Sequence, residues 1–106
     1  MPTIRIYKEH RLQEYLELRH KVFVKEQGVD PHIEHDEYDT LNRDDVIHFA
    51  YWHDKILVAT ARVLIKDERT VQFGRIATLK EFRNQGYASR LLRDLEVYCH
   101  NIGYEV

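Results

Sequence analysis

Alternating hydrophobic and polar positions predict the strands of this chain. Residues 3–9 (TIRIYKE) alternate along a first short run. Three further runs are rich in β-branched and aromatic residues and are separated by short turns: VIHFAYW at 46–52, ILVATARVLI at 56–65 and TVQFGRIATL at 70–79. Because only a few residues join these three runs, we expect three consecutive antiparallel strands.

Hydrophobic residues at helical spacing predict a helix over residues 10–26. Leu12 and Leu16 recur on one face, which also carries Arg19 and Glu26. A charged residue on such a face is either a snorkelling side chain or half of an ion pair, and we expect Arg19 to be paired.

A second helix is predicted after the strand at 70–79 and extends to about Asn101. Gly103 suits its C-terminal cap, and YEV at 104–106 resembles the start of another strand. The hydrophobic positions of this helix repeat at intervals of three and four, and they are Ala88, Leu91, Leu92, Leu95, Cys99 and Ile102. The order strand, helix, three strands, helix and incipient strand indicates one α+β domain over residues 1–106, with a mostly antiparallel mixed sheet.

Composition narrows the class of protein. The net charge of −2 gives no reason to expect a nucleic-acid partner. No hydrophobic run approaches the length of a membrane span, and the first ten residues lack the core of a signal peptide, so we expect no membrane partner and a cytoplasmic location. The single cysteine, Cys99, has no internal disulfide partner, and its helical position favours a buried structural thiol over a nucleophile.

Residues 30–45 form an acidic segment without a clear period. The stretch HIEHDE (32–37) mixes histidine and carboxylate side chains, but it lacks the spacing of known zinc and calcium motifs, so we expect no metal. Two interpretations stay open. The segment is a solvated loop, or it lies over an acceptor site and attracts a cationic amine.

The stretch RNQGYASRLLRDLE places a polar, glycine-containing turn between a strand and an amphipathic helix. The first N–H groups of a helix lack internal partners and lie at the positive end of its dipole, so this arrangement can hold a phosphate. A turn of this kind also begins many helices that bind nothing. The pattern alone leaves both possibilities open.

This turn and the order of elements resemble the GCN5-related N-acetyltransferase (GNAT) superfamily. Its signature, Q/R-x-x-G-x-G/A, matches RNQGYA at 83–88. The blocks LRHKVFVKEQGV, EHDEYD and VIHFAYW resemble the subgroup of ElaA-like or predicted GNAT acyltransferases. The resemblance covers nearly the whole chain and implies the GNAT fold, with a mixed, mostly antiparallel sheet flanked by helices.

The resemblance also implies acetyl-CoA as co-substrate and transfer of an acetyl group to a small amine or a peptide amine. The pyrophosphate would bind to the turn, where Gly86 allows close approach, and the pantetheine arm would pair with the exposed strand backbone. The cofactor-binding residues implied are Ile76, Ala77, Thr78, Arg83, Asn84, Gln85, Gly86, Tyr87, Ala88 and Ser89. An acyl-homoserine-lactone synthase, which shares the fold but uses another donor and acceptor, is an alternative that the intact turn disfavours.

Two residues are candidates for the base that such a transfer needs. Glu26 ends the predicted first helix, and hydrophobic neighbours would raise the pKa of its carboxyl group. Its alternatives are a solvated helix-end acid or a partner of Arg19. His48 shares a strand face with Ala50 and Trp52, and it is either a base or an inward-facing structural histidine.

The resemblance breaks at the C-terminus, where the family normally continues with a fifth strand, a further helix carrying a tyrosine acid, and more strands. No residue here matches that tyrosine. The chain is therefore expected to be truncated, to associate as a homodimer that fills the missing layer, or to be a catalytically incomplete module for CoA binding or dimerisation.

Overall fold

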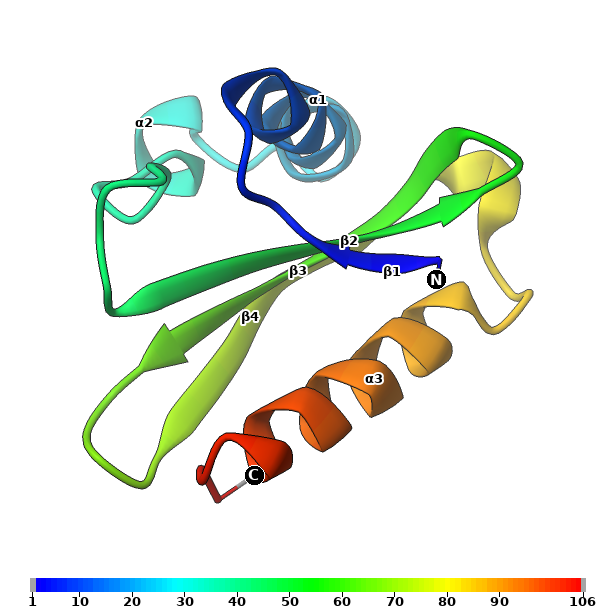
Figure 1. Cartoon of the computed structure of the whole chain (residues 1–106). Helices are drawn as coiled ribbons and strands as arrows, with labels where there is room; N and C mark the ends of the chain where they lie inside the picture. Colours follow the sequence, from blue (N-terminus) through cyan, green and yellow to red (C-terminus); the bar gives the residue numbers. More distant parts are fainter. Residues whose placement is uncertain (1, 106) are drawn as a thin grey trace.

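The structure, a computed structural model, describes residues 2–105. Four antiparallel strands form one sheet in the order β1-β2-β3-β4. Helices α1 and α2 lie on one face of this sheet and α3 lies on the other (Figure 1). The strands are β1 (Thr3–Arg5), β2 (Val46–His53), β3 (Ile56–Ile65) and β4 (Val71–Thr78). The helices are α1 (Glu9–Arg19), the π-helical η1 (His20–Glu26), α2 (Pro31–Glu34), the 3₁₀ turn η2 (Lys80–Phe82) and α3 (Tyr87–Asn101).

The predicted α+β class and the three consecutive antiparallel strands are confirmed. The first strand is shorter than predicted, because the chain leaves the sheet to enter α1. Ile6 still donates its N–H to the carbonyl of His48 (2.9 Å), but its side chain is buried against Leu12 and Tyr15 of α1. Lys8 then lies just before the first turn of α1.

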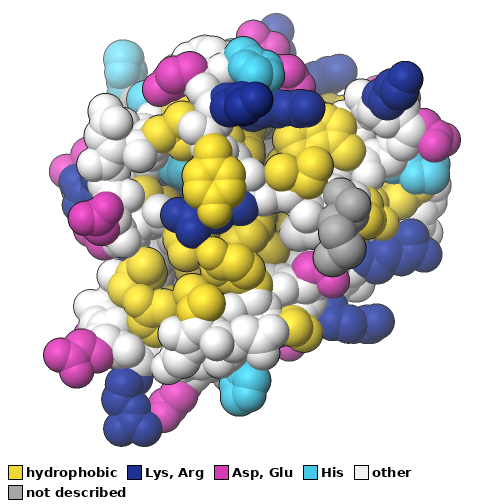
Figure 2. All heavy atoms as spheres, in the orientation of Figure 1, with side chains coloured by type: hydrophobic (Ala, Val, Ile, Leu, Met, Phe, Trp, Pro, Cys, Tyr) yellow, Lys and Arg dark blue, Asp and Glu magenta, His cyan; other side chains and the backbone are white. Residues whose placement is uncertain are grey.

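The edge strand β1 borders a hydrophobic surface. Hydrophobic side chains gather across the middle of the face that carries β1, between the layer of α1 and α3 (Figure 2). Ile4 and Tyr7 near this edge are 41% and 69% exposed. Among residues 2–105, no helix combines the length and hydrophobic character needed to span a bilayer.

The helix predicted over residues 10–26 changes its geometry midway. It is α-helical to Arg19 and π-helical from there, with the N–H of Gln27 bonded to the carbonyl of Val22 five residues earlier (3.2 Å). The wider turn rotates the hydrophobic face, so that Val22 packs with Leu18 against Ala77 of β4. This places η1 beside the C-terminal half of β4.

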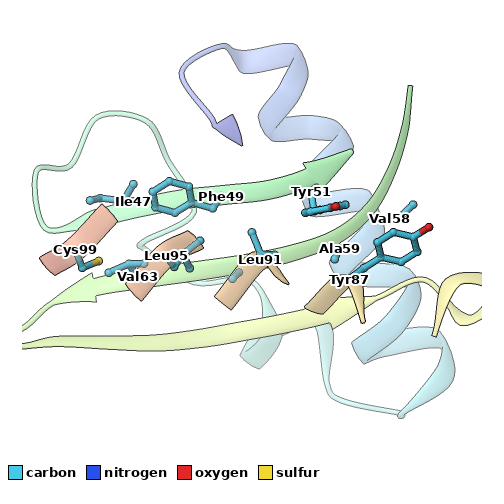
Figure 3. Close-up of a cluster of buried hydrophobic side chains, with 11 residues drawn as sticks. Ile47, Phe49, Tyr51, Val58, Ala59, Val63, Tyr87, Leu91, Leu95 and Cys99 are labelled. Atoms are coloured by element: carbon cyan, nitrogen blue, oxygen red, sulfur yellow. The ribbon is translucent and has the colours of Figure 1, made fainter. Parts of the chain in front are cut away.

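The larger core lies between the sheet and α3 (Figure 3). Leu91, Leu95 and Cys99 are fully buried there, as their predicted stripe required, and burial raises the pKa of the Cys99 thiol. Ile102 is 50% exposed, contrary to the prediction. It follows the last helical residue, where Gly103 (φ +102°) turns the chain away from the core.

The end of α3 is closed by two capping bonds. Gly103 donates its N–H to the carbonyl of His100 (3.1 Å), and Tyr104 donates to that of Cys99 (2.9 Å), which is the Schellman arrangement. The strand start expected at 104–106 is present as one parallel bridge between Glu105 and Thr70. Val106 lies outside the described residues.

Strand β4 is bulged. Arg62 pairs with Gly74 and Thr60 pairs with Ala77, so β4 carries one residue more than β3 in this interval. Arg75 within the bulge adopts the left-handed conformation (φ +49°). The Thr60 hydroxyl donates to the carbonyl of Arg75 (3.1 Å), which satisfies a group that the bulge removes from the ladder.

Candidate functional site

The turn before α3, the C-terminal half of β4 and the end of η1 enclose a groove of about 410 Å³. All but one of the residues expected to bind the cofactor line it, and Gln85 is the exception. Its side-chain amide donates instead to the carbonyl of Glu81 (3.3 Å). The lining residues are Val22, Gln27, Ile76, Ala77, Thr78, Phe82, Arg83, Asn84, Gly86, Tyr87, Ala88 and Ser89.

The turn depends on two left-handed residues, Asn84 (φ +63°) and Gly86 (φ +84°). Gly86 lies directly before α3, and its carbonyl accepts the N–H of Arg90 (3.0 Å). A Cβ placed on Gly86 would meet no atom within 4 Å, so its backbone angle, and not crowding within the chain, calls for glycine here. The N–H groups of the first turn of α3 therefore begin at an open surface.

Arg83 joins three parts of the groove. Its Nε donates to the carbonyl of Thr78 (3.0 Å), and a terminal nitrogen lies 2.9 Å from the Glu26 carboxylate at the end of η1. Both side chains remain partly exposed, at 36% for Arg83 and 29% for Glu26. Glu26 is thus paired across the groove, and its expected alternative as a partner of Arg19 was wrong.

His48 lies away from the groove, on the sheet face that packs against α1. Its Nδ1 is 3.0 Å from the Tyr15 hydroxyl, and its Nε2 is 3.0 Å from the carbonyl of Tyr38 and 3.3 Å from that of Thr40. Burial lowers the pKa of His48, which favours the neutral imidazole. This geometry supports the structural alternative for His48.

A partly buried cluster of charges lies beside α2, and apart from the pairing of Arg19 it could not be predicted from the sequence. It joins three arginines to three carboxylates from the acidic segment and involves four secondary-structure elements and a loop. We call it the ionic cluster, and its members are Arg19 (α1), Glu34 (α2), Asp36 and Asp39 (the loop after α2), Arg62 (β3) and Arg75 (β4). The segment is therefore not merely a solvated loop, because three of its carboxylates are held by arginine.

Arg19 is the centre of the ionic cluster. It has no exposed side-chain surface and donates to Glu34 (2.7 Å) and to both carboxylate oxygens of Asp39 (2.5 and 3.1 Å). The expected pairing of Arg19 is confirmed, although its partners were not foreseen. Burial alone would raise the pKa of Asp39, but the hydrogen bond and charge of Arg19 outweigh it and lower that pKa.

The other two arginines fasten the acidic segment to the sheet. Arg62 donates to both oxygens of Asp36 (2.7 and 2.9 Å). Arg75 donates to the same carboxylate (3.2 Å) and to the backbone carbonyls of Ile33 and Glu34 (3.2 and 3.1 Å). The bulge of β4 is thereby tied to α2.

A second, smaller pocket lies between α2, the end of η1 and the bulge of β4. Its volume is about 240 Å³ and it shares Ile76 with the groove. We call it the α2 pocket, and its lining residues are Phe23, Val29, Ile33, Glu34, Arg75 and Ile76. Sequence analysis missed it, because its walls come from three segments far apart in the chain.

The groove has the chemistry of an anion site next to a strand edge. Unpaired N–H groups of a helix and a guanidinium favour a phosphate at one end. Thr78 turns its carbonyl away from β3, as its bond to Arg83 shows, so backbone groups of the strand face the groove. Within residues 2–105, no group of three or more histidine, cysteine or acidic side chains is placed to hold a metal ion.

Comparison with known proteins bears on this geometry. The model of the acetyltransferase (GNAT) family matches residues 7–106. A Bacillus subtilis protein named "Putative acetyltransferase BSU40680" is 38% identical over 96 residues, which is 91% of this chain. The chain spans 64% of the length of that curated relative and 61% of a second one from the same organism.

Solved structures show the same fold. Escherichia coli ElaA is 27% identical with a TM-score of 0.79, over 93% of this chain and 69% of that protein. An acyl-CoA N-acyltransferase from Pseudomonas aeruginosa is 28% identical with a TM-score of 0.79, over 94% and 70% of the two chains.

Proposed function

The chain belongs to the GNAT family of acetyltransferases, and from this premise we propose that it takes part in the transfer of an acetyl group from acetyl-CoA to a primary amine. The observation that carries the proposal is the groove between β4 and α3. It combines the unpaired N–H groups of a helix, the guanidinium of Arg83 and an exposed strand backbone along one continuous surface.

In this proposal the pyrophosphate of acetyl-CoA binds at residues 83–89, and the pantetheine arm follows β4 from Thr78 to Ile76. The amine nitrogen attacks the thioester carbonyl carbon, the carbon–sulfur bond breaks, and the thiolate of CoA receives the proton that the amine loses. An ammonium group cannot attack, because its nitrogen has no free lone pair. A base that removes the proton of the ammonium before the attack therefore assists the reaction.

Glu26 is the base that we propose. Its ion pair with Arg83 holds the carboxylate in place before the cofactor binds. A pyrophosphate carries more negative charge than a carboxylate and competes with Glu26 for Arg83. Binding of the cofactor then frees the Glu26 carboxylate at the pyrophosphate end of the groove, from which it accepts the proton of the amine through a water relay. The alternative base, His48, would have to give up its bonds to Tyr15 and to the backbone.

We further propose that the protein acts in the cytoplasm and associates as a homodimer. The exposed Ile4 and Tyr7 beside the edge strand β1 support association. The same observation favours the dimerisation form of a second candidate function, a module for dimerisation or CoA binding without catalysis.

Calorimetric titration with acetyl-CoA tests the proposal, with Gly86→Val as the variant that blocks the turn. Valine at φ +84° is strained and its branches occupy the space over the first turn of α3, so binding should be lost. Circular dichroism establishes that the variant is folded. If folded Gly86→Val binds acetyl-CoA as tightly as the parent, the proposed pyrophosphate site is wrong.

Arg83→Ala tests the role of the guanidinium separately. We expect it to weaken acetyl-CoA binding by about 1–3 kcal/mol, as for a lost charge-assisted hydrogen bond. Arg93→Ala is the matched control, because Arg93 is an exposed arginine further along α3 that does not line the groove. Equal effects of the two substitutions would rule out a specific contact by Arg83.

A further inference from the structure

Resting on the function proposed above, we propose that the acceptor is an apolar amine with a single positive charge, and that its hydrocarbon part binds in the α2 pocket. Neither the family nor the named relatives specify an acceptor for this chain. The position of the pocket, its lining and the pairing of the charges around it favour such an acceptor.

The position of the α2 pocket follows from the direction of the groove. The turn at residues 83–88 meets β4 at Thr78, where Arg83 bonds to the strand carbonyl. A cofactor that begins at this turn and follows β4 passes Ala77 and reaches Ile76, which also lines the α2 pocket. The pocket thus lies beyond the end where the thioester is expected, on the side from which an acceptor can approach.

The lining is mainly hydrophobic. Phe23, Val29, Ile33 and Ile76 supply most of it, and Ile33 and Ile76 are large hydrophobic side chains that stay 68% and 39% exposed. Exposed hydrophobic residues that meet in a hollow mark a binding surface more often than single scattered ones. At about 240 Å³ the pocket is smaller than those of drug-sized ligands, about 300–1,000 Å³, and suits a small amine.

The two charged residues that line the α2 pocket are already paired. The Glu34 carboxylate receives Nε of Arg19 (2.7 Å), and Arg75 donates to Asp36 and to backbone carbonyls of α2. The ionic cluster contains three guanidinium groups and three carboxylates, so it is neutral as a whole.

Glu34 is the one carboxylate among the residues that line this pocket, so the lining offers no uncommitted carboxylate for a second ammonium group. Asp30, just before α2, is an exposed carboxylate that caps this helix by accepting the N–H of His32 (2.8 Å), and it does not line the pocket. Glu34, Asp36 and Asp39 are each paired with an arginine. We therefore no longer expect these three carboxylates of the acidic segment to attract a cationic amine.

An apolar pocket also favours the protonation state of the amine that acetyl transfer requires. Transfer of an ammonium group into hydrophobic surroundings favours its neutral form, which is the form that attacks the thioester. A diamine in the same pocket would bury a second charge without a partner.

The test compares hexylamine with hexane-1,6-diamine, which share a six-carbon chain and differ by the second ammonium group. We expect kcat/KM for acetyl transfer from acetyl-CoA to be at least tenfold higher with hexylamine. Equal values, or a preference for the diamine, would overturn the proposal.

Ile33→Asp places a carboxylate at the pocket, and we expect it to reduce or reverse the preference for hexylamine. Ile33 is exposed, so its replacement leaves the core intact. Ile102→Asp is the matched control, because Ile102 is also an exposed isoleucine and lies beyond the end of α3, outside the pocket. An unchanged preference in Ile33→Asp would show that the hydrocarbon chain binds elsewhere.

A binding measurement separates this inference from the proposed function. In the presence of CoA, hexylamine should shift the backbone amide NMR signals of residues 23–34 and 75–76, whether or not transfer occurs. If calorimetry shows acetyl-CoA binding and hexylamine shifts none of these signals, the acceptor inference fails and the cofactor proposal stands. If acetyl-CoA does not bind but hexylamine shifts them, the proposed function fails and the apolar pocket remains.

Discussion

Arg19 has no exposed side-chain surface, and its charge is stable there only because two carboxylates accept from it. Hydrophobic neighbours in the sequence placed it on the buried face of α1, so its pairing could be predicted. Its partners could not, because Glu34 and Asp39 reach it only after α2 has folded back onto α1. The residues next to Arg19 in the sequence do not indicate such a tertiary contact.

Arg19→Leu should lower the free energy of unfolding by about 3–5 kcal/mol, because it leaves the Glu34 and Asp39 carboxylates without their main partner. Urea unfolding monitored by circular dichroism measures the change. Arg43→Leu is the control, since the Arg43–Asp45 pair is partly exposed (36% and 43%) and should contribute less than about 1 kcal/mol. Comparable losses in both variants would contradict the assigned importance of burial.

His48 should make stability depend on pH. Burial lowers its pKa, although the nearby Asp39 charge opposes this, so the unfolded chain binds a proton more readily than the folded one. Its contribution is complete above the ordinary histidine pKa of about 6.5 and decreases as the pH falls below that value.

The prediction is that the free energy of unfolding decreases from about pH 7.5 to pH 5 in the parent and decreases less in His48→Gln. Urea unfolding at the two pH values gives the comparison. His100→Gln, at an exposed position of α3, should keep the slope of the parent. Identical slopes in the parent and His48→Gln would show that His48 titrates normally.

At the scale of elements, the turn between β2 and β3 shows how a predicted feature can still be strained. The sequence predicted a tight turn at 53–55, and the structure has Asp54 and Lys55 there, both with positive φ (+48° and +67°). These are the angles of a type I′ turn, which favours glycine at its second position. The chain keeps lysine there at a cost in backbone strain.

Lys55→Gly should therefore raise the free energy of unfolding, by about 0.5–1 kcal/mol. Lys55 is exposed, so the substitution removes no packed side chain. Thermal and urea unfolding measure the gain. Lys66→Gly, at an exposed lysine without a positive φ, should not stabilise the protein. A loss of stability in Lys55→Gly would mean that the turn angles differ from those described.

Elements with strong local patterns were predictable, and those shaped by tertiary contacts were not. Strands β2, β3 and β4 and the length of α3 follow from periodicity. The π-helical η1, the short α2 and the bulge at Arg75 do not, because packing against β4 and the ionic cluster determine them. The same division holds for the site: the motif at 83–89 located one wall of the groove, whereas the wall at Val22 and Gln27 depends on η1.

At the scale of the whole molecule, the two edges of the sheet differ in what they present. The groove and the α2 pocket lie along β4, whereas β1 is a three-residue edge strand beside a hydrophobic surface (Figure 2). Association through the β1 edge would cover exposed hydrophobic side chains and leave the groove open.

Size-exclusion chromatography with light scattering should give the mass of a dimer for the parent. Ile4→Lys introduces a charge at this edge, where Ile4 is 41% exposed, and should shift the protein to the monomer. Ile102→Lys is the control at an exposed isoleucine outside this edge. A parent that elutes as a clean monomer would exclude the dimer.

The ionic cluster constrains how this sequence can diverge. Each of its six residues contacts a group of opposite charge, so loss of one removes a charged partner from a cluster whose centre, the pair of Arg19 and Asp39, is fully buried. Single substitutions therefore pass through a destabilised protein, whereas simultaneous replacement of paired members avoids that intermediate. Among descendants of this chain, the identities at 19, 34, 36, 39, 62 and 75 should consequently covary as a group. A search for such correlated changes would recognise the connection between α2 and the bulge without a structure.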